Sequence, residues 1–328
     1  MRPLARALSW GIAAVAAVAC VVLGVPLAAG SFGVAQLVSF RAVLAVALAA
    51  AAVLVAAVGL LLPRRARRAA VPLVLVLALG AGAQVGVLAW RATGDPPDRR
   101  EAAGAPLVVL SFNTLGVVPP QTLARLAQQQ DADVVVLPET SDATAAATQE
   151  ILADAGIPMR RYAGPSADPH VDGVALLVRT ALGEYPDAVE VPMRHGALRV
   201  EGAGTRPTIV AVHPVSPTAA GSMPTWREET RASVDECTDH PGAIVAGDFN
   251  ATLDHPALRR LGTCVDAARE VGEAATGTWP AAAPGWLATP IDHVLVDARA
   301  WRVLDFRVLP AAGGSDHRPV VATLEARR

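Results

Sequence analysis

Residues capable of joint chemistry stand where short apolar runs begin or end, at several places after residue 106. In AIVAGDFN an apolar run passes through Gly247 to Asp248 and Asn250. Similar runs elsewhere are bounded by an amide, a carboxylate or a histidine, namely at Asn113, Glu139, His213, Asp292, Asp316 and His317. A turn or a helix cap explains one such residue. Six strand ends of this kind predict a shared site, because a rigid sheet fixes side chains that loops leave open to substrate.

The chemistry open to this set of residues is narrow. Glu139, Asp248 and Asp316 offer hard oxygen ligands and Asn113 offers a neutral one, which suits Mg²⁺ or Mn²⁺ better than zinc. A divalent ion offsets the charge of phosphoryl oxygens, while a carboxylate orients water and a protonated histidine serves the leaving oxygen. The residue types therefore indicate hydrolysis of a phosphate ester.

Side-chain direction supports this interpretation around two of the strand ends. In an extended chain residues i and i+2 point the same way, so Asp248 and Asn250 are expected to face one cleft while Phe249 turns into the core. The same rule sends Asp292 and His293 in opposite directions. We therefore expect His293 to be a non-catalytic residue at the surface of the sheet.

From Leu107 onward, short apolar runs alternate with polar helical stretches, which is typical of an α/β domain. Nine segments predict strands: LVVLSFN, DVVVLPE, GVALLVR, ALRVEG, TIVAVHP, AIVAGDFN, IDHVLV, WRVLDFRVL and PVVATLE. Three predict helices, with HPALRRLG as a further candidate: PQTLARLAQQQ, SDATAAATQEILADAG and PTWREETRASVDEC. Residues 107–328 are ample for one core. Residues 92–106, rich in Pro, Gly and charge, predict a linker.

The first 91 residues have the composition of a membrane anchor. They contain eight arginines and no Asp or Glu, whereas the rest of the chain carries all 30 acidic residues. Three uncharged apolar runs, at about residues 8–29, 42–62 and 69–90, are each long enough to cross a bilayer, which takes roughly 20 residues. We therefore predict three transmembrane helices.

Arginines set the expected orientation of these helices. Arg2 and Arg6 precede the first run and RRARR at residues 64–68 separates the second from the third, while the loop SFGVAQLVSF is uncharged. The positive-inside rule then places the N-terminus in the cytoplasm and everything after Arg91 outside it. The alternative is a cleaved signal peptide, but the first apolar core is long and PLAAG is a poor cleavage site. We expect a multi-pass protein of the cell membrane with an extracytoplasmic domain.

Cysteine usage is compatible with this placement. Cys237 and Cys264 are the only cysteines beyond the apolar runs. An extracytoplasmic compartment permits a disulfide between them, and two free buried thiols are an equal alternative.

Five motifs together resemble the ordered set of the endonuclease/exonuclease/phosphatase superfamily. They are FNT at Asn113, LPET at Glu139, GDFNA at Asp248 and Asn250, IDHVLV at Asp292, and SDHRPV at Asp316 and His317. The superfamily includes DNase I-like nucleases, apurinic endonucleases, neutral sphingomyelinases and inositol-polyphosphate 5-phosphatases. The resemblance covers about residues 107–324 and implies a four-layered α/β sandwich, two mixed β-sheets flanked by helices, here preceded by the three transmembrane helices.

The resemblance also implies a role for each motif residue. Asn113 and Glu139 resemble the metal-binding pair, with Glu139 as the principal ligand. Asp316 resembles the second carboxylate near the metal. Asp248 is similar to the group that orients or deprotonates the attacking water, and Asn250 to a residue that contacts the scissile phosphate.

Four histidine-related positions follow from the same resemblance. His317 resembles the histidine that faces the phosphate, and Asp292 the carboxylate that fixes its tautomer and raises its pKa. His213 is similar to a second acid/base or phosphate ligand. His170 lies in a loop where some relatives place a phosphate-contacting side chain, and is otherwise a solvated residue.

The remaining histidines and two tryptophans have simpler interpretations. His195, His240 and His255 are expected at surface or cap positions. Trp226 is expected to pack in the core, whereas Trp279, shortly before IDHVLV, is a candidate for lining the cleft.

The charge balance bears on the substrate. A protein that grips duplex DNA presents a basic face, because Arg and Lys contacts with phosphates dominate its affinity. This chain has no lysine, and residues 92–328 carry 30 acidic residues against 20 arginines. Local clusters at Arg160–Arg161 or Arg259–Arg260 are the best basic candidates. Tight non-specific binding of DNA is not expected, and nucleic acid, phospholipid head groups and small phosphate esters stay open as substrates.

We therefore predict a membrane-tethered, divalent-metal-dependent phosphoesterase that hydrolyses phosphodiester bonds outside the cytoplasm. Two other classes of function stay open. The outer domain could be a catalytically silent binding module, although every key position is filled. The apolar runs could be a transport component, but they lack the ionisable residues that mark an ion path. The lipid bilayer is an expected partner, and no protein partner is predicted.

Overall fold

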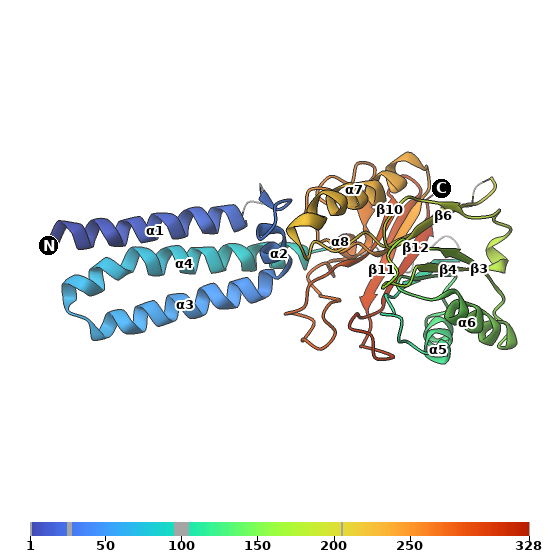
Figure 1. Ribbon diagram of the computed structural model, residues 1–328, viewed down its shortest axis with the longest axis horizontal. Helices are drawn as coiled ribbons and strands as arrows, with labels where there is room; N and C mark the ends of the chain where they lie inside the picture. Colours follow the sequence, from blue (N-terminus) through green and yellow to red (C-terminus); the bar gives the residue numbers. More distant parts are fainter. Residues whose placement is uncertain (1, 25–27, 95–104, 205, 328) are drawn as a thin grey trace. The chain divides into compact units, whose positions relative to one another are not determined.

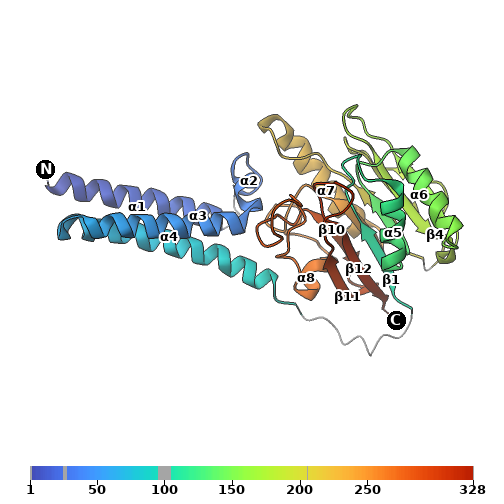
Figure 2. The ribbon, with the colours of Figure 1, turned by 90° about the horizontal axis from the view of Figure 1, so that it is seen from below.

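The chain folds as two compact units, Met1–Trp90 and Arg91–Arg328. The computed structural model describes residues 2–24, 28–94, 105–204 and 206–327. Figures 1 and 2 show that the first unit consists of helices and the second of strands covered by helices. Most of the predicted linker at residues 92–106 lies outside the described residues, so the linker stays a prediction.

Three helices of the first unit overlap the predicted apolar runs, and a fourth, α2, lies in the segment predicted as a loop. They are α1 (Arg2–Gly24), α2 (Val34–Ser39), α3 (Arg41–Leu61) and α4 (Arg64–Arg91). Two segments, Arg41–Leu61 and Arg67–Arg91, are long and apolar enough to cross a membrane, whereas Trp10–Val22 of α1 is a shorter apolar stretch. Length and composition thus support two of the three predicted transmembrane helices, and the first is not confirmed.

In the first unit, several large apolar side chains are exposed and two polar side chains that contact each other are buried. Val53, Leu54 and Leu79 are exposed. Arg41, which opens α3, is buried and donates a hydrogen bond to Oε1 of buried Gln84 in α4. This arrangement is typical of helices packed in lipid, where a polar side chain needs a partner on a neighbouring helix.

Strands of the second unit form two six-stranded sheets (Figure 1). The first has the order β11-β12-β1-β2-β4-β3, with β1 (Leu107–Ser111), β2 (Val134–Leu137), β3 (Met159–Gly164), β4 (Val174–Arg179), β11 (Trp301–Val308) and β12 (Val320–Ala326). The second has the order β5-β6-β7-β8-β10-β9, with β5 (Val189–Glu190), β6 (Ala197–Glu201), β7 (Thr208–Val212), β8 (Ile244–Asp248), β9 (Cys264–Asp266) and β10 (Asp292–Asp297). Both sheets are mixed, because β1 and β2 are parallel, β7 and β8 are parallel, and the other described pairs are antiparallel.

Helices cover the outer face of each sheet. They are α5 (Pro120–Gln130) and α6 (Asp142–Asp154) on the first sheet and α7 (Met223–Asp239) on the second. The short helix α8 (Ala267–Val271) contacts β10 and β11 and adds Ala267 and Ala268 to the core between the sheets. Two short 3₁₀ turns are η3 (Thr180–Leu182) and η4 (Ala220–Ser222). Along β1 and β2, Val109 and Val134 join the core between the sheets, while Leu110 and Val135 pack under α5 and α6. The predicted α/β sandwich of two mixed sheets flanked by helices is confirmed.

All nine predicted strands form, and the exceptions lie at the edges. β3, β5 and β9 were not predicted, and each is an edge strand of its sheet. An edge strand is solvated on one side, so β3 (MRRYAG) lacks the continuous apolar run that marks a central strand. The further helix candidate, HPALRRLG, was wrong, because these residues form turns instead of a regular helix.

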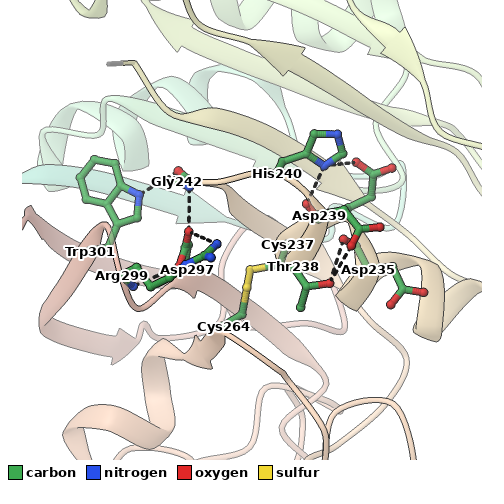
Figure 3. The surroundings of a disulfide bond; sticks show 11 residues. Asp235, Cys237, Thr238, Asp239, His240, Gly242, Cys264, Asp297, Arg299 and Trp301 are labelled. Atoms are coloured by element: carbon green, nitrogen blue, oxygen red, sulfur yellow. Dashed lines mark hydrogen bonds and ion pairs between the residues drawn. A yellow bond between two sulfur atoms is a disulfide. The ribbon is translucent and has the colours of Figure 1, made fainter. Parts of the chain in front are cut away.

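A disulfide joins Cys237, near the end of α7, to Cys264, the first residue of β9 (Figure 3). Both cysteines are buried, and Cys20 is the free cysteine among the described residues. Nearby, Nδ1 of His240 lies 3.0 Å from the Glu236 carbonyl oxygen, so His240 sits at the end of α7 as expected of a cap. The disulfide closes a segment of 27 residues that contains the GDFNA motif.

Reduction of this disulfide is expected to lower the melting temperature by about 10 °C. A closed loop of this length restricts the unfolded chain by about 3.5 kcal/mol, and 1 kcal/mol corresponds to about 2–4 °C in a domain of this size. Calorimetry of the full chain with and without dithiothreitol measures the shift. The C237S/C264S double variant is the control, because its melting temperature should not respond to the reductant. Equal melting temperatures of the oxidised and reduced wild type would contradict the prediction.

Candidate active site

Strand pairing explains why residues far apart in the sequence meet. β1 and β2 are parallel neighbours, so Asn113 and Glu139, which follow them, emerge at the same edge of the first sheet. β7 and β8 are also parallel, so His213 and Asp248 emerge at one edge of the second. The side-chain amide of Asn113 donates a hydrogen bond of 3.0 Å to Oδ2 of Asp248. That bond joins the two edges into one site.

Two antiparallel pairings bring the last motifs to the same place. Asp292 opens β10 directly opposite Asp248 of β8. β12 runs antiparallel to β1 with Val320 opposite Ser111, so the residues just before β12, including His317, reach the end of β1. The first residues of β10 and β12 thus meet the last residues of β8 and β1.

Ser315 fixes the loop before β12 to the site. Its hydroxyl donates to the Asn113 carbonyl oxygen at 2.7 Å and accepts from the His317 N–H at 3.0 Å. No role for Ser315 was predicted from the sequence. Its contacts show that the first residue of the SDH motif ties the other two to the neighbouring strand.

Asn113 bridges two carboxylates at the bottom of the site. The fully buried amide donates to Oε1 of Glu139 and to Oδ2 of Asp248, both at 3.0 Å. Its Oδ1 accepts from the Leu115 N–H at 2.9 Å. Asn113 therefore holds the carboxylates of Glu139 and Asp248 close together, which favours a position beside a cation.

Glu139 and Asp316 are the two carboxylates on the open side of the site. Burial raises the pKa of Glu139, and the negative charge of Asp316 raises it further, while Asn113 and His317 oppose the change. Oδ2 of Asp316 accepts from Nε1 of Trp279 at 2.8 Å. Trp279 thus lines the site, as expected, by orienting a carboxylate.

Removing the indole hydrogen bond is expected to weaken the predicted metal site. In W279F, Asp316 loses the partner that holds it, and loss of such an outer partner typically costs about 10–100-fold in metal affinity or activity. Titration of activity with Mn²⁺ should show a half-saturating concentration about tenfold higher or more. Trp286, which is exposed and lies in the same loop, provides the control variant W286F. Equal Mn²⁺ requirements in W279F and wild type would contradict this role.

His317 and Asp292 form a buried ion pair. Nδ1 of His317 lies 2.9 Å from Oδ2 of Asp292, and Nε2 lies 3.6 Å from Oδ2 of Asp248. Burial alone would lower the pKa of His317, but the carboxylates of Asp292 and Asp248 outweigh it and raise the pKa to about 10. The Asp292 carboxylate also fixes the ring with its Nε2 toward the site, in line with the predicted roles.

His213 has the opposite electrostatic character. Its Nε2 lies 3.7 Å from Oε1 of Glu139 and 3.6 Å from Oδ2 of Asp248. Complete burial lowers the pKa of His213 well below its usual value, and the nearby His195 and His317 lower it further. The site therefore combines a charged histidine, His317, with a neutral one, His213. Two titratable groups whose pKa values are shifted apart in this way are typical of acid/base catalysis.

The GDFNA segment is bent by two special backbone positions. A Cβ on Gly247 would lie 2.0 Å from the Val212 carbonyl oxygen of β7, so only glycine fits there. β8 ends at Asp248, and Asn250 has a positive φ of 47°. Phe249 is fully buried, as predicted.

Asp248 and Asn250 make different contacts. Oδ1 of Asp248 accepts from the Asn250 N–H at 2.8 Å, and burial raises the pKa of Asp248. Nδ2 of Asn250 donates at 3.0 Å to the carbonyl oxygen of Pro214, the residue after His213. The strand ends at Asp248 and Asn250 lies in the turn, so the expectation that both side chains face one cleft stays a prediction.

The donor set fits a hard divalent cation. Oδ1 of Asp316 is buried without a hydrogen-bond partner among the described residues, and the neighbouring Glu139 offers a second carboxylate. Asp248, Asp292 and His317 also lie within 4.8 Å of one another. That second group is a poorer site, because a histidine must be neutral to bind a metal and the carboxylates keep His317 protonated. Glu139 and Asp316, with Asn113 beside them, fit the ion best.

Two other histidines lie near His213. The ring of His195 lies 4.8 Å from that of His213, centroid to centroid, and is half-buried. His195 is therefore partly exposed, as a surface position allows, and it also contacts a residue of the site. His170 is exposed and its N–H donates to Oδ1 of Asp168, so its phosphate contact stays untested.

Two histidines are buried in structural roles. Nδ1 of His255 accepts from the Thr252 N–H at 2.7 Å, so it caps its own turn, although it is buried instead of at the surface. His293 points away from the site, as expected, but it is also buried, between Asp266 at 2.7 Å and the Ala251 carbonyl oxygen at 2.9 Å. His293 thus lies on the face of the sheet, as predicted, but this face is covered by the N-cap of α8 and the turn after β8 and is not exposed to solvent.

Residues 110–317 match the sequence model of the Endonuclease/Exonuclease/phosphatase family. The match spans more than half of the chain and contains all the strand ends that form the site. This chain belongs to the endonuclease/exonuclease/phosphatase family. As a member of this family it is an enzyme that hydrolyses phosphate ester bonds.

Solved structures share the family fold at low sequence identity. An endonuclease/exonuclease/phosphatase from Beutenbergia cavernae DSM 12333 superposes with a TM-score of 0.57 at 20% identity, over 68% of this chain and 72% of that one. D. rerio TDP2 complexed with a single-strand DNA product gives 0.53 at 15% identity, over 68% and 100%. The human Nocturnin catalytic domain with a bound sulfate anion gives 0.52 at 17% identity, over 72% and 98%. No curated protein sequence matches the chain significantly.

Proposed function

We propose that this protein is a membrane-tethered, divalent-metal-dependent phosphodiesterase. One observation carries the proposal: Asn113 joins Glu139 to Asp248 beside the His317–Asp292 ion pair. These groups provide oxygen ligands for a cation, a base and a positively charged histidine in one place. Hydrolysis of a phosphodiester needs all three.

In this proposal each residue has a distinct task. Glu139 and Asp316 hold the ion, Mg²⁺ or Mn²⁺, which when bound offsets the negative charge of the phosphate. Asp248, whose pKa is raised by burial, accepts a proton from the attacking water. His317 is protonated at neutral pH and stabilises the phosphoryl oxygens or the leaving oxygen. His213 is neutral and contributes a hydrogen bond to the phosphate.

Nucleic acid and phospholipid head groups both stay possible substrates. Of the structural relatives, TDP2 is seen with a single-strand DNA product. Nine of the described arginines in the second unit are paired with acidic side chains, namely Arg160, Arg161, Arg179, Arg194, Arg199, Arg231, Arg299, Arg302 and Arg307. Such pairing reduces the positive charge that a polyanion could contact, so a substrate with a single scissile phosphate is favoured over a long duplex.

We further propose that all three apolar helices span the membrane and that the catalytic unit is extracytoplasmic. The arginine distribution and the Cys237–Cys264 disulfide, which suits an oxidising compartment, support this topology. A reporter phosphatase that is active only outside the cytoplasm, fused after Arg100, should be active. A silent reporter with normal expression would contradict the topology.

A substrate panel tests the reaction class. The full chain in detergent micelles is incubated with bis-p-nitrophenyl phosphate, p-nitrophenyl phosphate, single-stranded DNA, plasmid DNA and phospholipid vesicles. We expect turnover of the diester with Mg²⁺ or Mn²⁺ and none with EDTA. Preference for DNA or for vesicles assigns the substrate class. Absence of turnover on every substrate would contradict the proposal and favour a binding or transport role.

A further inference from the structure

Helix α7 carries a buried glutamate that contacts two active-site loops. Glu229 is 6% exposed, and it lies on the face of α7 that packs against the second sheet. Its Oε1 accepts from the Arg194 N–H at 2.8 Å and its Oε2 accepts from the Val215 N–H at 2.7 Å. A carboxylate buried in this way is costly unless such donors compensate it. Both of its oxygens are therefore used to hold main chain.

The two main-chain donors belong to the loops that carry the neutral histidine and its neighbour. Arg194 precedes His195 in the turn before β6, and Val215 lies two residues after His213 at the end of β7. The His213 N–H also donates to the Gly196 carbonyl oxygen at 3.1 Å. Glu229 thus connects the loop before β6 to the loop after β7. The same two loops are also connected by the pairing of β6 with β7.

The same helix also holds the Asp248–Asn250 turn. Nε1 of Trp226, one turn before Glu229, donates to the Asn250 carbonyl oxygen at 2.9 Å. Nδ2 of Asn250 donates in turn to the Pro214 carbonyl oxygen, between His213 and Val215. Three loops that follow or precede different strands are therefore fixed to two side chains of one helix.

We propose that Glu229 is a positioning residue for the reaction, because it holds the loops of His195 and His213 in register with the Asp248–Asn250 turn. The proposal rests on the proposed phosphodiesterase function for its kinetic consequence. A carboxylate is required because both partners are N–H donors. A glutamine of the same shape has one accepting oxygen, and its NH₂ group would face an N–H.

Kinetics of the E229Q variant of the full chain, in detergent micelles with bis-p-nitrophenyl phosphate and Mn²⁺, test the proposal. We expect kcat to fall about 10- to 100-fold, since displacement of a catalytic group by about 1 Å costs about that much. KM should change less than about threefold, because Glu139 and Asp316 still hold the cation and His317 still contacts the phosphate. Two controls on the same helix are E228Q, a change of an exposed neighbour, and E236Q, which removes an ion pair with Arg199. Both controls should keep the wild-type kcat.

Hydrogen exchange separates a positioning role from a general loss of stability. In E229Q the amides of Arg194 and Val215 should exchange faster, while amides of the central strands β7 and β8 stay protected. A kcat of E229Q within twofold of wild type, or unchanged exchange at Arg194 and Val215, would overturn the proposal. Absence of turnover by the wild type would instead overturn the proposed function. Hydrogen exchange at Arg194 and Val215 would then still test whether Glu229 holds the two loops.

Discussion

Replacing Glu139 with glutamine is expected to lower kcat/KM by about 10³-fold. The substitution keeps the size of the side chain but removes the negative charge that Asn113 holds beside the proposed metal position. Loss of the charge stabilisation that a bound cation supplies is worth several kcal/mol, and about 4 kcal/mol corresponds to about 10³-fold in rate. Turnover of bis-p-nitrophenyl phosphate across a range of Mn²⁺ concentrations measures the effect.

The control for Glu139 is E150Q, the same chemical change at an exposed residue of α6. It should leave kcat/KM at the wild-type value. Excess Mn²⁺ should restore part of the activity of E139Q if the loss is one of metal affinity. A kcat/KM of E139Q within tenfold of wild type would show that Glu139 is not a principal ligand.

The second large effect concerns His317 and the carboxylate behind it. H317Q is expected to lower kcat by about 10²–10⁴-fold, the usual contribution of a positioned acid or base. In the wild type the pKa of His317 is raised to about 10, so the ring stays protonated from neutral pH to about pH 9. Activity that depends on the protonated ring is therefore retained in this window and lost only as the pH rises through the raised pKa.

Removing the charge of Asp292 should move that loss to lower pH. In D292N the partner that raises the pKa of His317 is neutral, so the pKa falls and the alkaline decline of kcat begins at a lower pH. The pH profile of kcat from pH 6 to 10 measures the shift, and D305N on β11 is the matched control with an unchanged profile. If kcat declined at the same alkaline pH in D292N and in wild type, the proposed role of protonated His317 would be contradicted.

The site was predictable because its residues stand next to strands that the sequence marks clearly. LVVLSF, DVVVLP and AIVAGD are continuous apolar runs, and each leads into a polar residue of the site. The sequence does not say which strands are neighbours. The meeting of Asn113 with Asp248 depends on the pairing of β1 with β2 and of β7 with β8, and on the packing of two sheets, none of which leaves a local pattern.

The residues that the sequence analysis missed act through contacts that have no local signature. Ser315 and Glu229 bind main-chain groups of loops remote in the sequence. From sequence alone, a glutamate in a helix is expected to be exposed to solvent. Only the packing of α7 on the second sheet shows that Glu229 is buried.

Backbone conformation limited one further prediction. Alternation of side chains applies while the chain is extended, and β8 ends at Asp248. The positive φ of Asn250 then turns its amide toward Pro214. Phe249 is buried and His293 points away from the site, as alternation predicts, whereas the direction of Asn250 beyond the strand end is set by the turn.

Dependence of diester hydrolysis on an added divalent ion and on one histidine tests the central claim most directly. The full chain is freed of metal with EDTA, and turnover of bis-p-nitrophenyl phosphate is measured before and after addition of Mg²⁺ or Mn²⁺, for wild type and H317Q. We predict no turnover without the ion, restored turnover of wild type with it, and a rate for H317Q lower by at least about 10²-fold. Equal turnover with and without the ion, or equal rates of H317Q and wild type, would contradict the proposed site.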